Sequence, residues 1–142
     1  MPDPVEQCAT PWTKGDLSFA ENGVVLHVSN KRGSGCRKIK VDGCLPMEGA
    51  KCDWLAEGAR VVLLVELKGG HVDRAVEQLR NTLRWLNGNN YFQRHGKRCL
   101  IVTNGRGPRD IAKAQRQKDT FRGKLNAKLE VVRSGRTVPL EA

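Results

Sequence analysis

The stretch Val61-Val62-Leu63-Leu64-Val65-Glu66-Leu67-Lys68-Gly69-Gly70 decides how this chain is organised. It begins with five consecutive apolar residues, too few to span a membrane and rich in Val and Leu, so it predicts a buried central strand. Glu66 and Lys68 follow at alternate positions, so their side chains project from the same face of the strand. Because a buried charge is costly unless it is paired or binds a metal, this strand end is a candidate functional site.

A hairpin is predicted immediately before this strand. If Gly58-Ala59 forms a two-residue turn, Asp53 in the preceding strand lies opposite Leu64. Leu64 shares its face with Glu66, so Asp53 is expected on that face, one diagonal step from Glu66. A shift of one residue in the turn would send Asp53 to the other face, so this placement depends on the register.

A helix is predicted after Gly70, where the hydrophobic period changes from 2 to about 3.6. Its apolar stripe runs from Val72 to Leu86, and the helix is expected to end near Asn87-Gly88. Residues 99–103 predict another buried strand, and the order strand, helix, strand implies a crossover that joins a parallel pair. A basic helix is expected from about Arg109 to Phe121, and residues 129–132 predict a last strand.

The amino-terminal part gives weaker signals. Three prolines discourage long regular structure in residues 1–22, where a short helix around Trp12 to Phe19 is the one element indicated. Residues 24–28 have strand composition, and residues 38–41 alternate as the returning strand of a hairpin would. The basic loop from Lys31 to Gly35 would form the tip of that hairpin.

The positive charge is concentrated in the last third of the chain. Of the 142 residues, the first 93 carry 12 basic and 11 acidic side chains, whereas residues 94–142 carry 13 basic and 4 acidic ones. A basic surface favours polyanions, and nucleic acid is the commonest such partner. An acidic lipid surface is the alternative, but no basic helix with large apolar residues on its opposite face supports it.

The expected location is the cytoplasm, without membrane attachment. The start of the chain, Met1 to Glu6, lacks the charged and apolar regions of a signal peptide, and no apolar run has the length of a transmembrane helix. The five cysteines are an odd number without a Cys-x-x-Cys pair or zinc-ligand spacing. They are therefore predicted to be free thiols in a reducing compartment rather than disulfides or metal ligands.

Two carboxylates and an ammonium at one sheet edge suit phosphodiester hydrolysis assisted by a divalent metal. Asp53 and Glu66 supply the oxygen ligands that Mg²⁺ prefers, and the backbone carbonyl of Leu67 is a further candidate ligand. The ion would lower the pKa of a bound water, and Lys68 would orient that water or stabilise the charge of the transition state.

Asp53, the hairpin and Glu66-Leu67-Lys68 followed by an amphipathic helix resemble the PD-(D/E)xK nuclease superfamily, which includes restriction endonucleases and Holliday-junction resolvases. The resemblance covers about residues 24–103 of a single domain, 1–142. It implies an α/β fold of the restriction-endonuclease type, a mixed sheet of four to six strands flanked by helices in the core order αβββαβ. It also implies Mg²⁺-dependent cleavage of DNA, with Mn²⁺ able to substitute. Asp53 and Glu66 would be the metal ligands, Lys68 the catalytic lysine, and Gln78 would match a glutamine that assists the site in some branches.

The sequence departs from the family pattern in two places. Cys52 stands where the name of the motif has proline. Members often have a further acidic residue from an N-terminal helix; Glu21 and Glu6 are candidates, but neither lies in a convincing helix. Asp42, which also precedes the strand, is a rival to Asp53 as the first metal ligand.

The sequence therefore predicts a metal-dependent DNA nuclease. A homodimer is compatible with it, because cutting both strands usually takes two sites. The alternatives are a structural Glu–Lys pair at a strand end and a nucleic-acid-binding module, or a subunit of a larger nuclease, without turnover. No Gly-rich phosphate loop, Gly-x-Ser-x-Gly or Cys/His cluster supports another enzyme class. The basic segment 104–142 is expected to contact DNA phosphates through Arg106, Arg109, Lys113, Arg116, Arg122 and Lys124.

Overall fold

The computed structural model describes residues 3–67, 72–104 and 108–141, and its centre is a five-stranded mixed sheet. The strands lie in the order β3 (Arg37–Lys40), β4 (Trp54–Glu57), β5 (Val61–Leu67), β6 (Gly96–Thr103) and β7 (Ala127–Arg133). The pairs β3–β4 and β4–β5 are antiparallel, whereas β5–β6 and β6–β7 are parallel. Every residue of β5 is buried, so the predicted central strand and its parallel partner are both confirmed.

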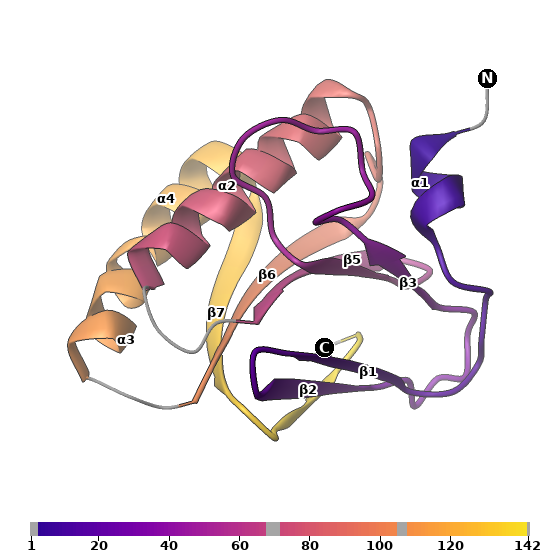
Figure 1. Cartoon of the computed structure of the whole chain (residues 1–142), viewed down its shortest axis with the longest axis horizontal. Helices are drawn as coiled ribbons and strands as arrows, with labels where there is room; N and C mark the ends of the chain where they lie inside the picture. The colour runs from indigo at the N-terminus through magenta and orange to yellow at the C-terminus, as the bar shows by residue number, and fades with distance from the viewer. Residues whose placement is uncertain (1–2, 68–71, 105–107, 142) are drawn as a thin grey trace.

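Three helices, α2 (Val72–Gly88), α3 (Pro108–Arg116) and α4 (Lys118–Leu125), cover one face of this sheet (Figure 1). The predicted amphipathic helix matches α2 along its whole length. The single basic helix expected from Arg109 to Phe121 was wrong, because α3 and α4 are separate and meet at Gln117. Only Ala114 and Phe121 are buried apolar residues in the described part of this region, too few for the hydrophobic period to reveal the break.

A second sheet covers the other face, in the order β1 (Leu17–Glu21), β2 (Val24–Ser29) and β8 (Thr137–Pro139) (Figure 1). The expected pairing of residues 24–28 with residues 38–41 was wrong, since β2 pairs with β1 and β8, and β3 pairs with β4. The expected helix around Trp12 to Phe19 is also absent, because residues 17–21 form β1. The signal for the true hairpin is Asn22-Gly23, whose φ angles of 55° and 73° are those of a tight β-hairpin turn.

Two apolar layers result from this arrangement, and β5 contributes to both. Val62 and Leu64 belong to the core between the main sheet and the helices. Leu63, Val65 and Leu67 belong to the core between the two sheets. The continuous apolar run of β5 is thus explained by burial on both faces, which is typical of a strand in the middle of a parallel region.

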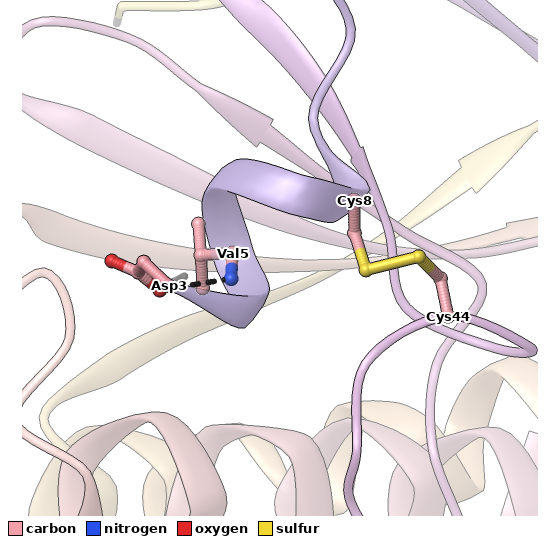
Figure 2. Close-up of a disulfide and its surroundings, with 4 residues drawn as sticks. All are labelled: Asp3, Val5, Cys8 and Cys44. Carbon is pink, nitrogen blue, oxygen red and sulfur yellow. Dashed lines mark hydrogen bonds between the residues drawn. A yellow bond between two sulfur atoms is a disulfide. The ribbon is translucent and has the colours of Figure 1, made fainter. Parts of the chain in front are cut away.

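A disulfide joins Cys8, at the end of α1 (Pro4–Cys8), to Cys44 in the loop after β3 (Figure 2). Asp3 caps the same helix by accepting a hydrogen bond from the Val5 N–H at 2.9 Å. The expectation that all five cysteines are free thiols was wrong, although Cys36, Cys52 and Cys99 are free and buried. The two bonded residues are 36 positions apart and meet because Ala9 forms a bridge with Ile39, which no cysteine spacing reveals.

The disulfide bears on the expected location. Such bonds persist mainly in oxidising compartments, so the prediction of a reducing cytoplasm has no support from the cysteines. Within residues 3–67, 72–104 and 108–141, no helix is long and apolar enough to cross a membrane.

Replacing both bonded cysteines by serine is expected to lower the free energy of unfolding by about 2–4 kcal/mol, because the bond closes a loop in the unfolded chain. Urea unfolding of the wild type and of the Cys8→Ser/Cys44→Ser variant measures this loss. Reductant should destabilise the wild type by a similar amount and leave the variant unchanged. Equal stability of wild type and variant under oxidising conditions would show that the bond does not constrain the chain.

Candidate active site

Asp53 lies just before β4, where the chain enters the central sheet beside the end of β5. Its N–H donates to the Val65 carbonyl at 3.1 Å, and its Oδ2 accepts from the Leu67 N–H at 2.8 Å. The register differs from the predicted one, because Leu55 rather than Asp53 pairs with Leu64. The connection after β4 is longer than two residues, and the Gly58 N–H donates to the Val61 carbonyl. A shift of two residues preserves which side chains share a face, and Asp53 does meet Glu66.

The carboxyl groups of Asp53, Glu66 and Glu21 gather at this sheet edge. Glu66 is 1% exposed and Asp53 7% exposed, and Asp53 interacts with the side chains of both Glu66 and Glu21. Burial is the main reason that the pKa of Asp53 rises to about 6. Glu21 raises that pKa further, while the Leu67 N–H and Glu66 act in the opposite direction. Burial and the Glu21 carboxylate thus favour the protonated form of Asp53.

Glu21 reaches this group from β1, in the second sheet. Burial raises its pKa, but the hydrogen bond from Lys40 and the nearby side chains of Asp53 and Trp54 outweigh that effect, so the pKa of Glu21 is lowered. The Lys40 Nζ lies 2.6 Å from Glu21 Oε1 and 4.6 Å from the centre of the Trp54 ring. The additional acid predicted at Glu21 therefore lies beside Asp53, although it comes from a strand rather than a helix. The other candidate, Glu6, pairs with Arg37, and the rival Asp42 is exposed.

Lys68, the predicted catalytic lysine, lies outside the described residues. Leu67, whose carbonyl is a predicted metal ligand, is the last residue of β5 and is fixed to Asp53 through its N–H. In the sequence, Lys68 is the residue after Leu67.

Gln78 is connected to Asp53 through a buried threonine that sequence analysis did not single out. The Thr82 hydroxyl accepts from the Cys52 N–H at 2.9 Å and donates to the Gln78 carbonyl at 2.8 Å. This pair of bonds ties the loop that carries Asp53 to α2. The Gln78 Oε1 is buried and has no hydrogen-bond partner in the part of the chain that the structure describes. The signal for Thr82 was its place on the apolar edge of α2, where a hydroxyl needs a buried partner.

The described members of the predicted phosphate-binding set are spread over both ends of the main sheet. Arg106 and the side chain of Arg109 lie outside the described part of the chain, while Lys113 pairs with Asp73 at 3.2 Å and Arg116 is exposed. Arg122 lies beside Gly96, at the start of β6 and thus at the end of the sheet opposite to Glu66. Lys124 is near the end of α4, which leads to the start of β7.

The residues at the end of β5 fit a divalent cation with an incomplete protein ligand set. No three His, Cys, Asp or Glu side chains among residues 3–67, 72–104 and 108–141 are arranged to hold a metal by themselves. Mg²⁺, however, commonly binds through one or two carboxylates and keeps several waters. Asp53 and Glu66 match that requirement, and the raised pKa of Asp53 has the electrostatic origin that a bound cation would relieve.

Replacing Asp53 by asparagine is expected to stabilise the protein at pH 8 in EDTA. Because its folded pKa is raised, Asp53 favours folding below its ordinary pKa of 3.8 and loses that contribution as the pH rises through about 6. The neutral amide avoids this loss and keeps an oxygen for the Leu67 N–H. Thermal unfolding should show a rise of about 2–5 °C at pH 8, the shift that about 1 kcal/mol produces in a domain of this size, and none at pH 4. A lower melting temperature at pH 8 would contradict the electrostatic description.

Replacing Thr82 by valine is expected to cost about 1–3 kcal/mol, because the buried Cys52 N–H loses its acceptor. Thr82→Ser keeps the hydroxyl and serves as the matched control. Urea unfolding should rank the wild type first, the serine variant second and the valine variant last. A valine variant as stable as the wild type would remove the proposed link between α2 and the Asp53 loop.

Comparison of the chain with protein-family models, with curated proteins and with solved structures gives no match. What the chain does must therefore be argued from the residues at the end of β5.

Proposed function

We propose that the chain is a divalent-metal-dependent nuclease that hydrolyses phosphodiester bonds of DNA. One observation carries the proposal: the Asp53 carboxylate is held by the Leu67 N–H at the end of the central strand, in contact with the buried Glu66. Two buried carboxylates side by side at the end of a strand supply the oxygen ligands that a hard divalent cation prefers.

The topology supports the same proposal. Strands β3, β4 and β5 form a meander, and α2 then crosses to β6, which pairs parallel to β5. This run β3, β4, β5, α2, β6 is similar to the βββαβ part of the core that the resemblance to PD-(D/E)xK nucleases implies, although β1 and β2 separate it from α1. The second sheet, the disulfide and the extension through β7 are additions to that core.

Each residue near the end of β5 has a role in this proposal. Asp53 and Glu66 would hold the cation, with the Leu67 carbonyl as a third protein ligand. A divalent ion held there would supply a water of lowered pKa and screen the charge on the phosphate. Lys68, which follows Leu67, stabilises the additional negative charge of the transition state. Glu21 adds negative charge beside Asp53, while its ion pair with Lys40 holds it in place.

A non-catalytic nucleic-acid-binding module is the second candidate, and the positive charge of the carboxyl-terminal third favours it equally. The buried pair Asp53 and Glu66 distinguishes the two functions. A binding surface needs cations, and carboxylates at its centre repel the phosphates that it must hold. A metal-dependent reaction gives both acids a role, as ligands of the cation.

Cleavage assays test the proposal. The wild type should cut duplex, single-stranded or branched DNA in Mg²⁺ or Mn²⁺ and should be inactive in EDTA. Asp53→Asn, Glu66→Gln and Lys68→Ala should each lower the rate by about 10²-fold or more, the usual loss on removing a group that stabilises the transition state. Asp42→Asn is the matched control. The Asp42 carboxylate is exposed, and its residue is close to Asp53, because the Asp42 N–H donates to the Asp53 carbonyl.

The control variant should cut at the wild-type rate. Salt-sensitive DNA binding by the wild type without any cleavage in either metal would reject the nuclease and support the binding module. Equal activity of Asp53→Asn and the wild type would show that the cleavage arises elsewhere.

A further inference from the structure

A basic groove opens beside the candidate active site, at the ends of β6 and β7. It has a volume of about 510 Å³, and its positively charged lining residues are Lys118, Arg133 and Arg136. Thr103, Gln115 and Thr137 add neutral polar groups, and none of the described residues that line the groove is acidic. None of the three cations is among the predicted phosphate-binding residues, and Arg133 and Arg136 follow the last predicted strand.

These three cations are available to a ligand. Lys118, Arg133 and Arg136 are exposed, and none forms an ion pair with another residue of the described ranges. Arg37 and Arg98, in contrast, are buried and paired with glutamates. The larger groove beside α2, of about 610 Å³, is lined by Glu48, Asp73 and Glu77 as well as by arginines, which makes it unfavourable for a polyanion.

The two arginines are presented by a turn with a fixed shape. The Arg136 N–H donates to the Arg133 carbonyl at 3.2 Å, and Gly135 adopts a φ of 87° that favours glycine. The Ser134 N–H donates to the Thr103 carbonyl at 2.7 Å, so the turn is tied to the end of β6. A turn held in this way loses little conformational entropy when it binds a ligand.

The same turn is joined to the acidic group through the β1–β2 hairpin. The Val25 N–H donates to the Ser134 Oγ at 2.9 Å, and the Val25 carbonyl accepts from the Gly135 N–H at 2.8 Å. Val25 follows Val24, which pairs with Glu21, the residue whose carboxylate meets Asp53. The hairpin tip, the end of β5 and the β7–β8 turn thus lie together at one end of the molecule (Figure 1).

The spacing suits successive phosphates. Leu67 pairs with Val102, and Thr103 pairs with Arg133, so the groove lies two strands away from β5 at the same end of the sheet. Two strand spacings are about 10 Å, so the groove lies within reach of a phosphate close to the one at the end of β5.

We propose that Lys118, Arg133 and Arg136 form a subsite for the DNA backbone, which holds phosphates close to the bond that is cut. This assignment rests on the proposed nuclease function, because it takes the end of β5 as the point of cleavage. The subsite contacts phosphates and no base edges, so it contributes affinity without sequence preference.

Binding of a fluorescein-labelled DNA duplex tests the subsite separately from cleavage. Fluorescence anisotropy is measured in Ca²⁺ on the Glu66→Gln background, across a series of NaCl concentrations. Adding Arg133→Ala/Arg136→Ala should weaken binding about tenfold or more and reduce the slope of log K against log salt by about 2, or about 0.9 per lost phosphate contact. Arg60→Ala/Arg94→Ala is the matched control, since both arginines are exposed near Gly96 at the opposite end of the sheet.

The control should bind as tightly as its parent, and unchanged melting temperatures would show that all variants are folded. If the wild type cuts DNA but Arg133→Ala/Arg136→Ala binds and cuts normally, the subsite is wrong and the nuclease stands. If this variant loses binding while the wild type never cuts DNA, the groove is a DNA-binding surface and the proposed nuclease activity is wrong. If only the Arg122→Ala/Lys124→Ala variant loses binding, DNA contacts the opposite end of the sheet and the proposed subsite is wrong.

Discussion

The hydrogen bond from the Leu67 N–H to the Asp53 carboxylate is the interaction on which the candidate site depends. It joins the end of the central strand to the residue before β4, and so brings an acidic side chain against Glu66 in a place that water hardly reaches. Burial, with the Glu21 carboxylate beside it, raises the pKa of Asp53 to about 6. A buried carboxyl group with a strongly shifted pKa is typical of functional sites.

Two supports outside the main sheet keep this arrangement in place. Thr82 fixes the Asp53 loop to α2 through the Cys52 N–H, and the second sheet brings Glu21 and its Lys40 partner to the same edge. The β1–β2 hairpin also anchors the turn that carries Arg133 and Arg136. The small sheet thus connects the acidic site with the basic groove, through a hydrogen bond between Val25 and Ser134, which are 109 positions apart in the chain.

The central strand, α2 and the parallel partner β6 could be predicted from the sequence, because each has a strong hydrophobic period of its own. The face of Asp53 could also be predicted, although its partner across the hairpin could not. The predicted register assumed a two-residue turn at Gly58-Ala59, whereas Glu57 pairs with Val62. The true register is shifted by two residues, and an even shift leaves Asp53 on the predicted face. The second sheet was not predicted, although Asn22-Gly23 is a signal for its hairpin turn. The Cys8–Cys44 bond was not predicted either, because its two cysteines come together only through the pairing of Ala9 with Ile39. The basic groove could not be predicted, as its cations come from α4 and from the turn after β7, which only the tertiary structure brings together.

Anomalous X-ray scattering from crystals of the protein soaked in Mn²⁺ tests the central claim most directly. The account predicts one strong manganese peak between the carboxylates of Asp53 and Glu66, within coordination distance of the Leu67 carbonyl, and no peak at that position in Asp53→Asn crystals. A wild-type crystal in which manganese binds elsewhere, or in which a protein side chain rather than a metal neutralises the two carboxylates, would contradict it.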